Sequence, residues 1–165
     1  MPTKDYSSAQ EHMIADYLGW SVVAGSGAAA CYPGDIISDE WLGECKTHVE
    51  TGKKIFFSYS VWKKICDEAS VKHRFPVLFT DDGSQKSNKT WCLIPYRCVD
   101  ETKCSRYRID KEVRTNINFV HDAMIVQYNI FNTSSVEKSA VFTAVWHGEH
   151  VALLPLQVFK ELYCD

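Results

Sequence analysis

Two acids and a lysine in the N-terminal third have the types and spacing for chemistry on a phosphate. Asp35 begins a short apolar run, and Glu44 and Lys46 follow it, two residues apart. Side chains two apart on a strand project from the same face, so Glu44 and Lys46 share a face. A tight turn between Asp35 and Glu44 can return the first acid beside the other two groups. The segment predicts two carboxylates and one ammonium at the end of a small hairpin.

Carboxylates gathered in this way need a cation. At about 4 Å and an effective dielectric of about 20, each like-charge pair costs about 4 kcal/mol. A divalent ion removes that cost, and oxygen ligands favour Mg²⁺, for which Mn²⁺ can substitute. Such an ion polarises a phosphoryl oxygen and activates a bound water, while Lys46 orients that water or offsets developing charge. The pattern indicates metal-assisted hydrolysis of a phosphodiester, with the backbone carbonyl of Cys45 as a further candidate ligand.

The elements that must position these groups begin with a helix over about 7–19. Its apolar residues form one stripe, Ser7 or Ser8 is a candidate N-cap, and Gly19 suits its end. Glu11 is expected on or beside the buried face of this helix, an unusual place for an acid. A short strand over 20–24 follows, and then a loop of small residues.

The rest of the chain alternates apolar and polar segments. A second helix is expected after Ser58 or Ser60, and strands are expected at 76–80, 91–94, 124–131, 140–146 and 151–154, with a last helix after Pro155. The charged region 100–115 is expected to be a connection or an insertion. This order predicts an α/β fold with a mixed sheet. The tail can extend that sheet or form a small subdomain, and both remain open.

Taken in order, these features resemble the PD-(D/E)xK nuclease superfamily. The matching parts are Glu11 in the first helix, the loop Gly25-Ser26-Gly27, Asp35 after Pro33-Gly34, and Glu44-Cys45-Lys46. The compact layout is most similar to archaeal-type Holliday junction resolvases and related phage and viral endonucleases.

The resemblance covers about residues 7–95 of a chain expected to be one nuclease domain over 1–165. It implies a restriction-endonuclease-like core, in which helices flank a central mixed β-sheet, with a β-rich C-terminal extension over about 100–165.

The resemblance also implies roles for individual residues. Asp35 and Glu44 would be metal ligands and Lys46 the catalytic lysine, while Glu11 would be the auxiliary acid of the site. Ser26, with Gly27 beside it, would lie near the scissile phosphate.

Two lysines on the turn that follows the Glu44 strand are candidates for contact with DNA. Lys53 and Lys54 can flank phosphates entering the site. A homodimer is expected, because symmetric cleavage of two strands needs a second subunit.

The net charge of −3 leaves the DNA substrate open, because junction resolvases are usually basic. A branched DNA is one candidate, and ordinary DNA cut by a restriction-like or nicking nuclease is another. A non-catalytic nuclease-like module that binds DNA or protein is the third. The pattern His147-Gly148-Glu149-His150 is more typical of a solvated hairpin than of a metal site.

The composition is that of an ordinary globular protein, with 45% hydrophobic and 24% charged residues over 165 positions. Seven cysteines without a CxxC pair indicate free thiols rather than disulfides or a zinc ribbon. We therefore expect a cytoplasmic, reducing setting, with no membrane span and no signal peptide. These features do not distinguish a phage, viral or cellular origin.

Overall fold

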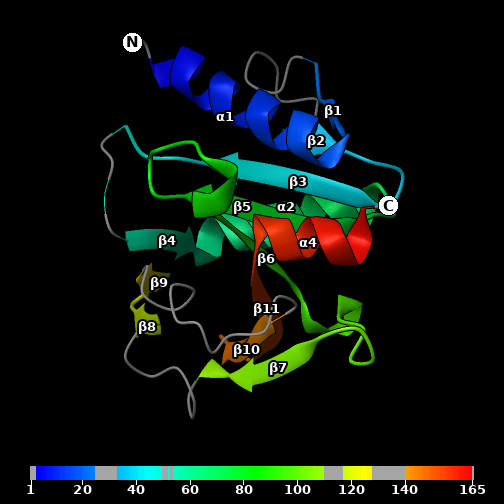
Figure 1. Ribbon diagram of the computed structural model, residues 1–165, viewed down its shortest axis with the longest axis vertical. Coiled ribbons are helices and arrows are strands. Elements are labelled where there is room, and N and C mark those ends of the chain that lie inside the picture. The colour runs from blue at the N-terminus through cyan, green and yellow to red at the C-terminus, as the bar shows by residue number, and fades with distance from the viewer. Residues whose placement is uncertain are drawn as a thin grey trace.

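A computed structural model describes residues 3–24, 33–49, 52, 54–109, 117–127 and 140–164 (Figure 1). In chain order the elements are α1 (Thr3–Leu18), β1 (Ser21–Val22), β2 (Ile36–Ile37), β3 (Trp41–Lys46), β4 (Lys54–Ser58), α2 (Tyr59–Val71), β5 (Phe75–Asp81), η1 (Ser87–Lys89), β6 (Thr90–Pro95), η2 (Tyr96–Cys98), β7 (Ser105–Arg108), β8 (Ile117–Val120), β9 (Ala123–Gln127), β10 (Ala140–Trp146), β11 (Glu149–Pro155) and α4 (Leu156–Tyr163).

The main sheet has eight strands in the order β1-β2-β3-β5-β6-β11-β10-β7. Strands β1, β2 and β3 form an antiparallel meander, and α2 then crosses over so that β5 lies parallel to β3. The next strands are antiparallel until β7, which is parallel to β10. This architecture confirms the predicted α/β class and the mixed central sheet.

Helices cover both faces of this sheet. Apolar residues of α2 pack with Leu42 and Leu78 on one face, whereas α1 and α4 pack with Trp41 and Val77 on the other. Neighbouring residues along β3 and β5 therefore point into opposite cores, as strand geometry requires. Burial on both faces explains why the predicted strand over 76–80 is an uninterrupted apolar run.

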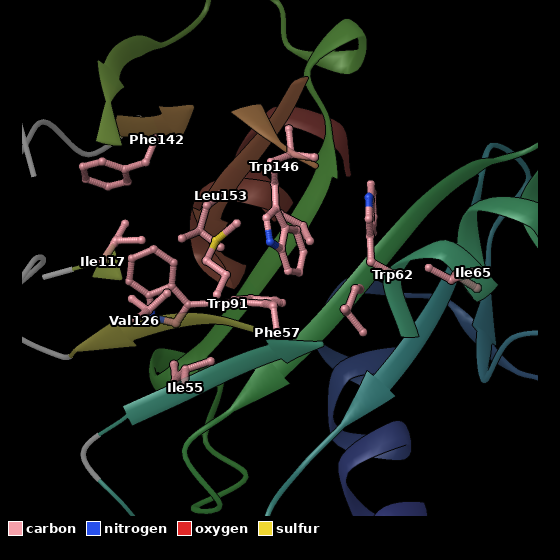
Figure 2. Close-up of a cluster of buried hydrophobic side chains, with 14 of the residues drawn as sticks. Ile55, Phe57, Trp62, Ile65, Trp91, Ile117, Val126, Phe142, Trp146 and Leu153 are labelled. Carbon is pink, nitrogen blue, oxygen red and sulfur yellow. The ribbon is translucent and has the colours of Figure 1, made fainter. Parts of the chain in front are cut away.

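A second sheet, in the order β4-β9-β8, packs over the α2 side of the molecule. Figure 2 shows Ile55, Phe57 and Val126 from these strands among Trp146 and Leu153 of the main sheet. The same cluster includes Trp62 and Ile65 of α2. The small sheet thus adds a third layer over part of the central sheet.

Most predicted elements of the N-terminal two thirds are present, with one displaced boundary. Helix α1 begins at Thr3, so the prediction of a cap at Ser7 or Ser8 is wrong. The Ser7 hydroxyl instead donates to Glu11 Oε1, 3.3 Å away and one turn further along the helix. The predicted boundary at Ser58 is confirmed, although its side chain makes no capping bond.

The tail departs further from expectation. The region expected as a connection contains β7. Outside the tail, the turn expected after the Glu44 strand is followed at Lys54 by an unpredicted strand, β4. Strands β10 and β11 join the main sheet beside β6, so this part of the tail is a sheet extension. Within the described ranges, no helix has the length and apolar character needed to cross a membrane.

Candidate active site

The hairpin of β2 and β3 brings Asp35 next to Glu44. Ile36 pairs with Gly43, and Asp35 N donates to the Gly43 carbonyl at 2.8 Å. Asp35 immediately precedes β2, and it lies close enough to Glu44 for the charge of Glu44 to act on its carboxyl. The Cys45 N–H donates to Asp35 Oδ2 at 2.8 Å, which fixes the orientation of that carboxyl.

Glu44 is an almost fully buried carboxylate, with only 3% of its surface exposed. Its Oε1 lies 2.8 Å from Lys46 Nζ and 3.7 Å from Lys64 Nζ of α2. A carboxylate is tolerated in such a position only when it is paired. The two ammonium groups supply that pairing, and Lys46 keeps half of its side chain exposed to solvent.

Crowding of acids shows in the pKa of Asp35, which is raised to about 7. Burial is the main cause, and the negative charges of Glu44 and Glu11 add to it, while the Cys45 N–H and Lys46 act in the opposite direction. Burial also raises the pKa of Glu11, and the charge of Glu44 adds to that effect. The predicted acids therefore interact in one electrostatic cluster.

Lys46 responds to the same acids. Burial alone would lower its pKa, but the hydrogen bond and charge of Glu44, together with Asp35, raise it overall. Lys46 is consequently a firmly charged ammonium while Glu44 is its partner. It would become a better proton carrier only after a cation replaced it at Glu44.

The first helix is attached to this cluster through a residue that the sequence did not indicate. Gln10 is fully buried, and its Nε2 donates to the carbonyl of Lys46 at 2.7 Å. This bond ties α1 to the end of β3. Glu11, the predicted auxiliary acid, is the next residue and is only partly buried, with its carboxylate accepting from Ser7.

Two side chains of α2 brace the acids from the other side, and these too were not predicted. Glu68 Oε2 accepts from the N–H of Gly34, the residue before Asp35, at 3.0 Å. Lys64 Nζ lies 3.6 Å from Glu68 Oε1 and also reaches Glu44. In the sequence, Lys64 and Glu68 are four residues apart on a predicted helix. That spacing indicates only an ordinary surface ion pair, not a contact with the acids.

The donor groups fit a divalent cation of the Mg²⁺ type. Among the described residues, no group of three His, Cys, Asp or Glu side chains is placed to hold a metal. Mg²⁺, however, is commonly bound by one or two carboxylates, with waters and substrate phosphate completing its shell. Asp35 and Glu44 supply that pair, and the Cys45 carbonyl remains a predicted ligand. Lys46 and Lys64 place positive charge at Glu44.

Of the residues predicted to contact DNA, only Lys54 is among those that the structure describes. Lys54 is exposed at the start of β4, where it pairs in register with Gln127. Ser26, Gly27 and Lys53 lie outside the described residues. The structure thus brings together the acids and Lys46, and places Lys54 on the strand that follows them.

Comparison of the chain with protein-family models, with curated proteins and with solved structures finds no match. The chemistry of the site is therefore inferred from its own residues.

Proposed function

We propose that this protein is a Mg²⁺-dependent endodeoxyribonuclease that hydrolyses phosphodiester bonds. One observation carries the proposal. The Asp35 carboxyl accepts from the Cys45 N–H beside Glu44, the charge of Glu44 raises its pKa, and Lys46 Nζ lies 2.8 Å from Glu44. A buried carboxylate and a half-buried one beside an ammonium form a costly arrangement for stability alone, whereas phosphodiester hydrolysis uses each of these groups.

The order of the elements supports the same proposal. Helix α1, the meander of β1, β2 and β3, the crossover helix α2 and the parallel strand β5 occur in that sequence. This is the order on which the resemblance to the PD-(D/E)xK superfamily rests. A restriction-endonuclease-like core is accordingly part of the proposal.

Each residue has a role that follows from its position. Asp35 and Glu44 hold the cation, and Glu11 adds negative charge from α1. When bound, Mg²⁺ supplies polarisation of the phosphoryl oxygen and lowers the pKa of a bound water. Lys46 is half exposed, so its ammonium can leave Glu44 for the attacking water or the phosphate.

DNA is the proposed substrate, either branched or ordinary duplex, and a homodimer is the proposed active form. Lys54, exposed on β4, is a candidate contact to the DNA backbone. In the predicted assembly, each subunit cuts one strand.

Cleavage of supercoiled plasmid and of a labelled four-way junction, in Mg²⁺ and in EDTA, tests this proposal. We expect cleavage in Mg²⁺ only, and a loss of at least about 100-fold in Asp35→Ala and Lys46→Ala. Lys72→Ala, which removes an exposed lysine beyond the far end of α2, is the matched control and should cut normally. Equal cutting by Lys46→Ala would refute the site. Absence of cutting on every DNA would favour the non-catalytic module.

A further inference from the structure

A second region of the molecule has features of a ligand site, and it lies at the opposite edge of the main sheet. A cavity of about 500 Å³ is bordered by Arg106 and Arg108 of β7, Phe119 of β8, Thr143 and Val145 of β10 and His150 of β11. Five strand spacings of about 4.8 Å separate β3 from β7, so this cavity is about 24 Å across the sheet from Glu44.

The described residues that line the cavity include two arginines, whose charge is opposite in sign to the net charge of the chain. Arg106 and Arg108 alternate along an edge strand, where both are exposed while Tyr107 between them packs into the core. His150 adds an imidazole, and no acid is among the described residues that line the cavity. Two guanidinium groups on one face form a fork that suits the oxygens of a phosphate.

Aromatic groups complete the surroundings. His150 stacks on the ring of Tyr96, with centroids 3.9 Å apart and planes 16° from parallel. The guanidinium of Arg106 lies 5.5 Å from the centre of the same Tyr96 ring. On another wall, Phe119 is 43% exposed, which is unusual for a side chain of this size.

We propose that this cavity binds a nucleoside phosphate, either as a free nucleotide or as one unit of a single-stranded nucleic acid. The phosphate would be held by Arg106 and Arg108, and the base would stack on the exposed face of Phe119. Stacking on aromatic side chains and basic contacts to the backbone are the two general means of binding single strands. A cavity of this volume is in the usual range for small-molecule sites.

One acid at the rim competes with the proposed ligand. Glu101 Oε1 lies 2.7 Å from Arg106 Nη1 and also accepts the hydroxyl hydrogen bond of Tyr96. Half of the Glu101 side chain is exposed, so this ion pair is weak and a phosphate can displace it. Removing the negative charge of Glu101 should therefore strengthen binding of an anion, whereas removing the positive charge of an arginine should weaken it.

The test is equilibrium binding, in EDTA, of adenosine 5′-monophosphate, a labelled ten-residue oligothymidylate, inorganic phosphate and adenosine. We expect Arg108→Gln to weaken binding of the nucleotide or oligonucleotide by about tenfold, and Glu101→Gln to strengthen it about twofold. Lys103→Gln, on the same turn as Glu101 but away from the cavity wall, should change it little. Phe119→Ser should weaken binding of both nucleotide probes but not of inorganic phosphate. The thermal unfolding midpoint of each variant should be measured as a control, so that a loss of binding is not confused with unfolding.

Tighter binding of the oligonucleotide identifies a strand as the natural ligand, and equal binding identifies a free nucleotide. The proposal fails if neither probe binds the wild-type chain, if Arg108→Gln and Lys103→Gln have equal effects, or if inorganic phosphate binds as tightly as the nucleotide. A chain that binds nucleotide but cuts no DNA would keep this inference and refute the proposed nuclease.

Discussion

The Asp35 carboxyl is the group most affected by the architecture of the site. Buried beside Glu44 and within the field of Glu11, its pKa is raised from 3.8 to about 7. An acid with a raised pKa binds its proton more tightly in the folded state than in the unfolded state. The contribution of Asp35 to the free energy of unfolding is therefore greatest below the pKa that Asp35 has in the unfolded chain. This contribution falls as the pH rises toward 7.

The pH dependence of stability should reveal this group. In chelator, the free energy of unfolding should fall between pH 4 and pH 7, with a contribution from Asp35 of up to about 4 kcal/mol. Asp35→Asn should remove that contribution and be more stable than the wild-type chain at pH 8. Urea unfolding of both proteins across this range makes the comparison. Parallel curves with a constant offset would contradict the raised pKa.

Residue types and spacing were sufficient to predict that Glu44 and Lys46 would share a face and that Asp35 would lie beside them. They were not sufficient for Gln10, Lys64 and Glu68. These side chains act from helices, and their contact with the hairpin depends on how α1 and α2 pack on the sheet. Such long-range packing is not encoded in local spacing.

At the scale of elements, the turn before β2 aims Asp35 at its neighbours. Gly34 has φ +72°, and a Cβ placed there would lie 2.7 Å from Leu42 Cδ1. The carboxylate of Glu68, on α2, accepts a hydrogen bond from the N–H of Gly34. The turn is thus constrained by its own conformation, by the β3 side chain and by the neighbouring helix.

A matched pair of glycine variants separates these constraints. Gly19 has nearly the same φ, +73°, but no atom lies within 4 Å of a Cβ placed there. Gly19→Ala should cost about 1 kcal/mol of stability and leave cleavage unchanged. Gly34→Ala should cost more, because Leu42 must also move, and should reduce cleavage by displacing Asp35. Thermal unfolding and plasmid nicking measure both effects; equal losses of nicking in the two variants would contradict the role of the turn.

The strands that sequence reasoning missed share a physical cause. β7 alternates exposed arginines with partly buried residues, and β8 exposes three of its four side chains. Both are short edge strands of their sheets, where apolar patterning is weak. The interior strand β5, which is apolar and covered on both faces, and strand β10, whose first four residues are buried, were predicted from the sequence.

At the scale of the whole molecule, one row of side chains joins the acidic cluster to the tail. Glu44 is in register with Leu78, which is in register with Leu93, then Leu153 and then Phe142. All four apolar members belong to one buried cluster. The tail therefore forms part of the core on which the site strands rest.

Leu153 is the central test of this continuity, because it is fully buried on β11. Leu153→Ala should lower the free energy of unfolding by about 2–5 kcal/mol. Val145→Ala, on the paired strand β10 but 64% exposed, should change it by less than about 0.5 kcal/mol. Chemical denaturation compares the two variants. A loss below about 1 kcal/mol at Leu153 would show that the tail is not part of the core.

The central claim is that Asp35 and Glu44 hold a divalent cation beside Lys46, and direct titration with Mn²⁺ tests it most directly. We expect saturable binding of one Mn²⁺ per chain at pH 8 and its loss in Asp35→Asn. Asp39→Asn, the same change at an exposed position of the same hairpin, should retain it. Binding of Mn²⁺ by Asp35→Asn with unchanged affinity would show that Asp35 does not hold the cation.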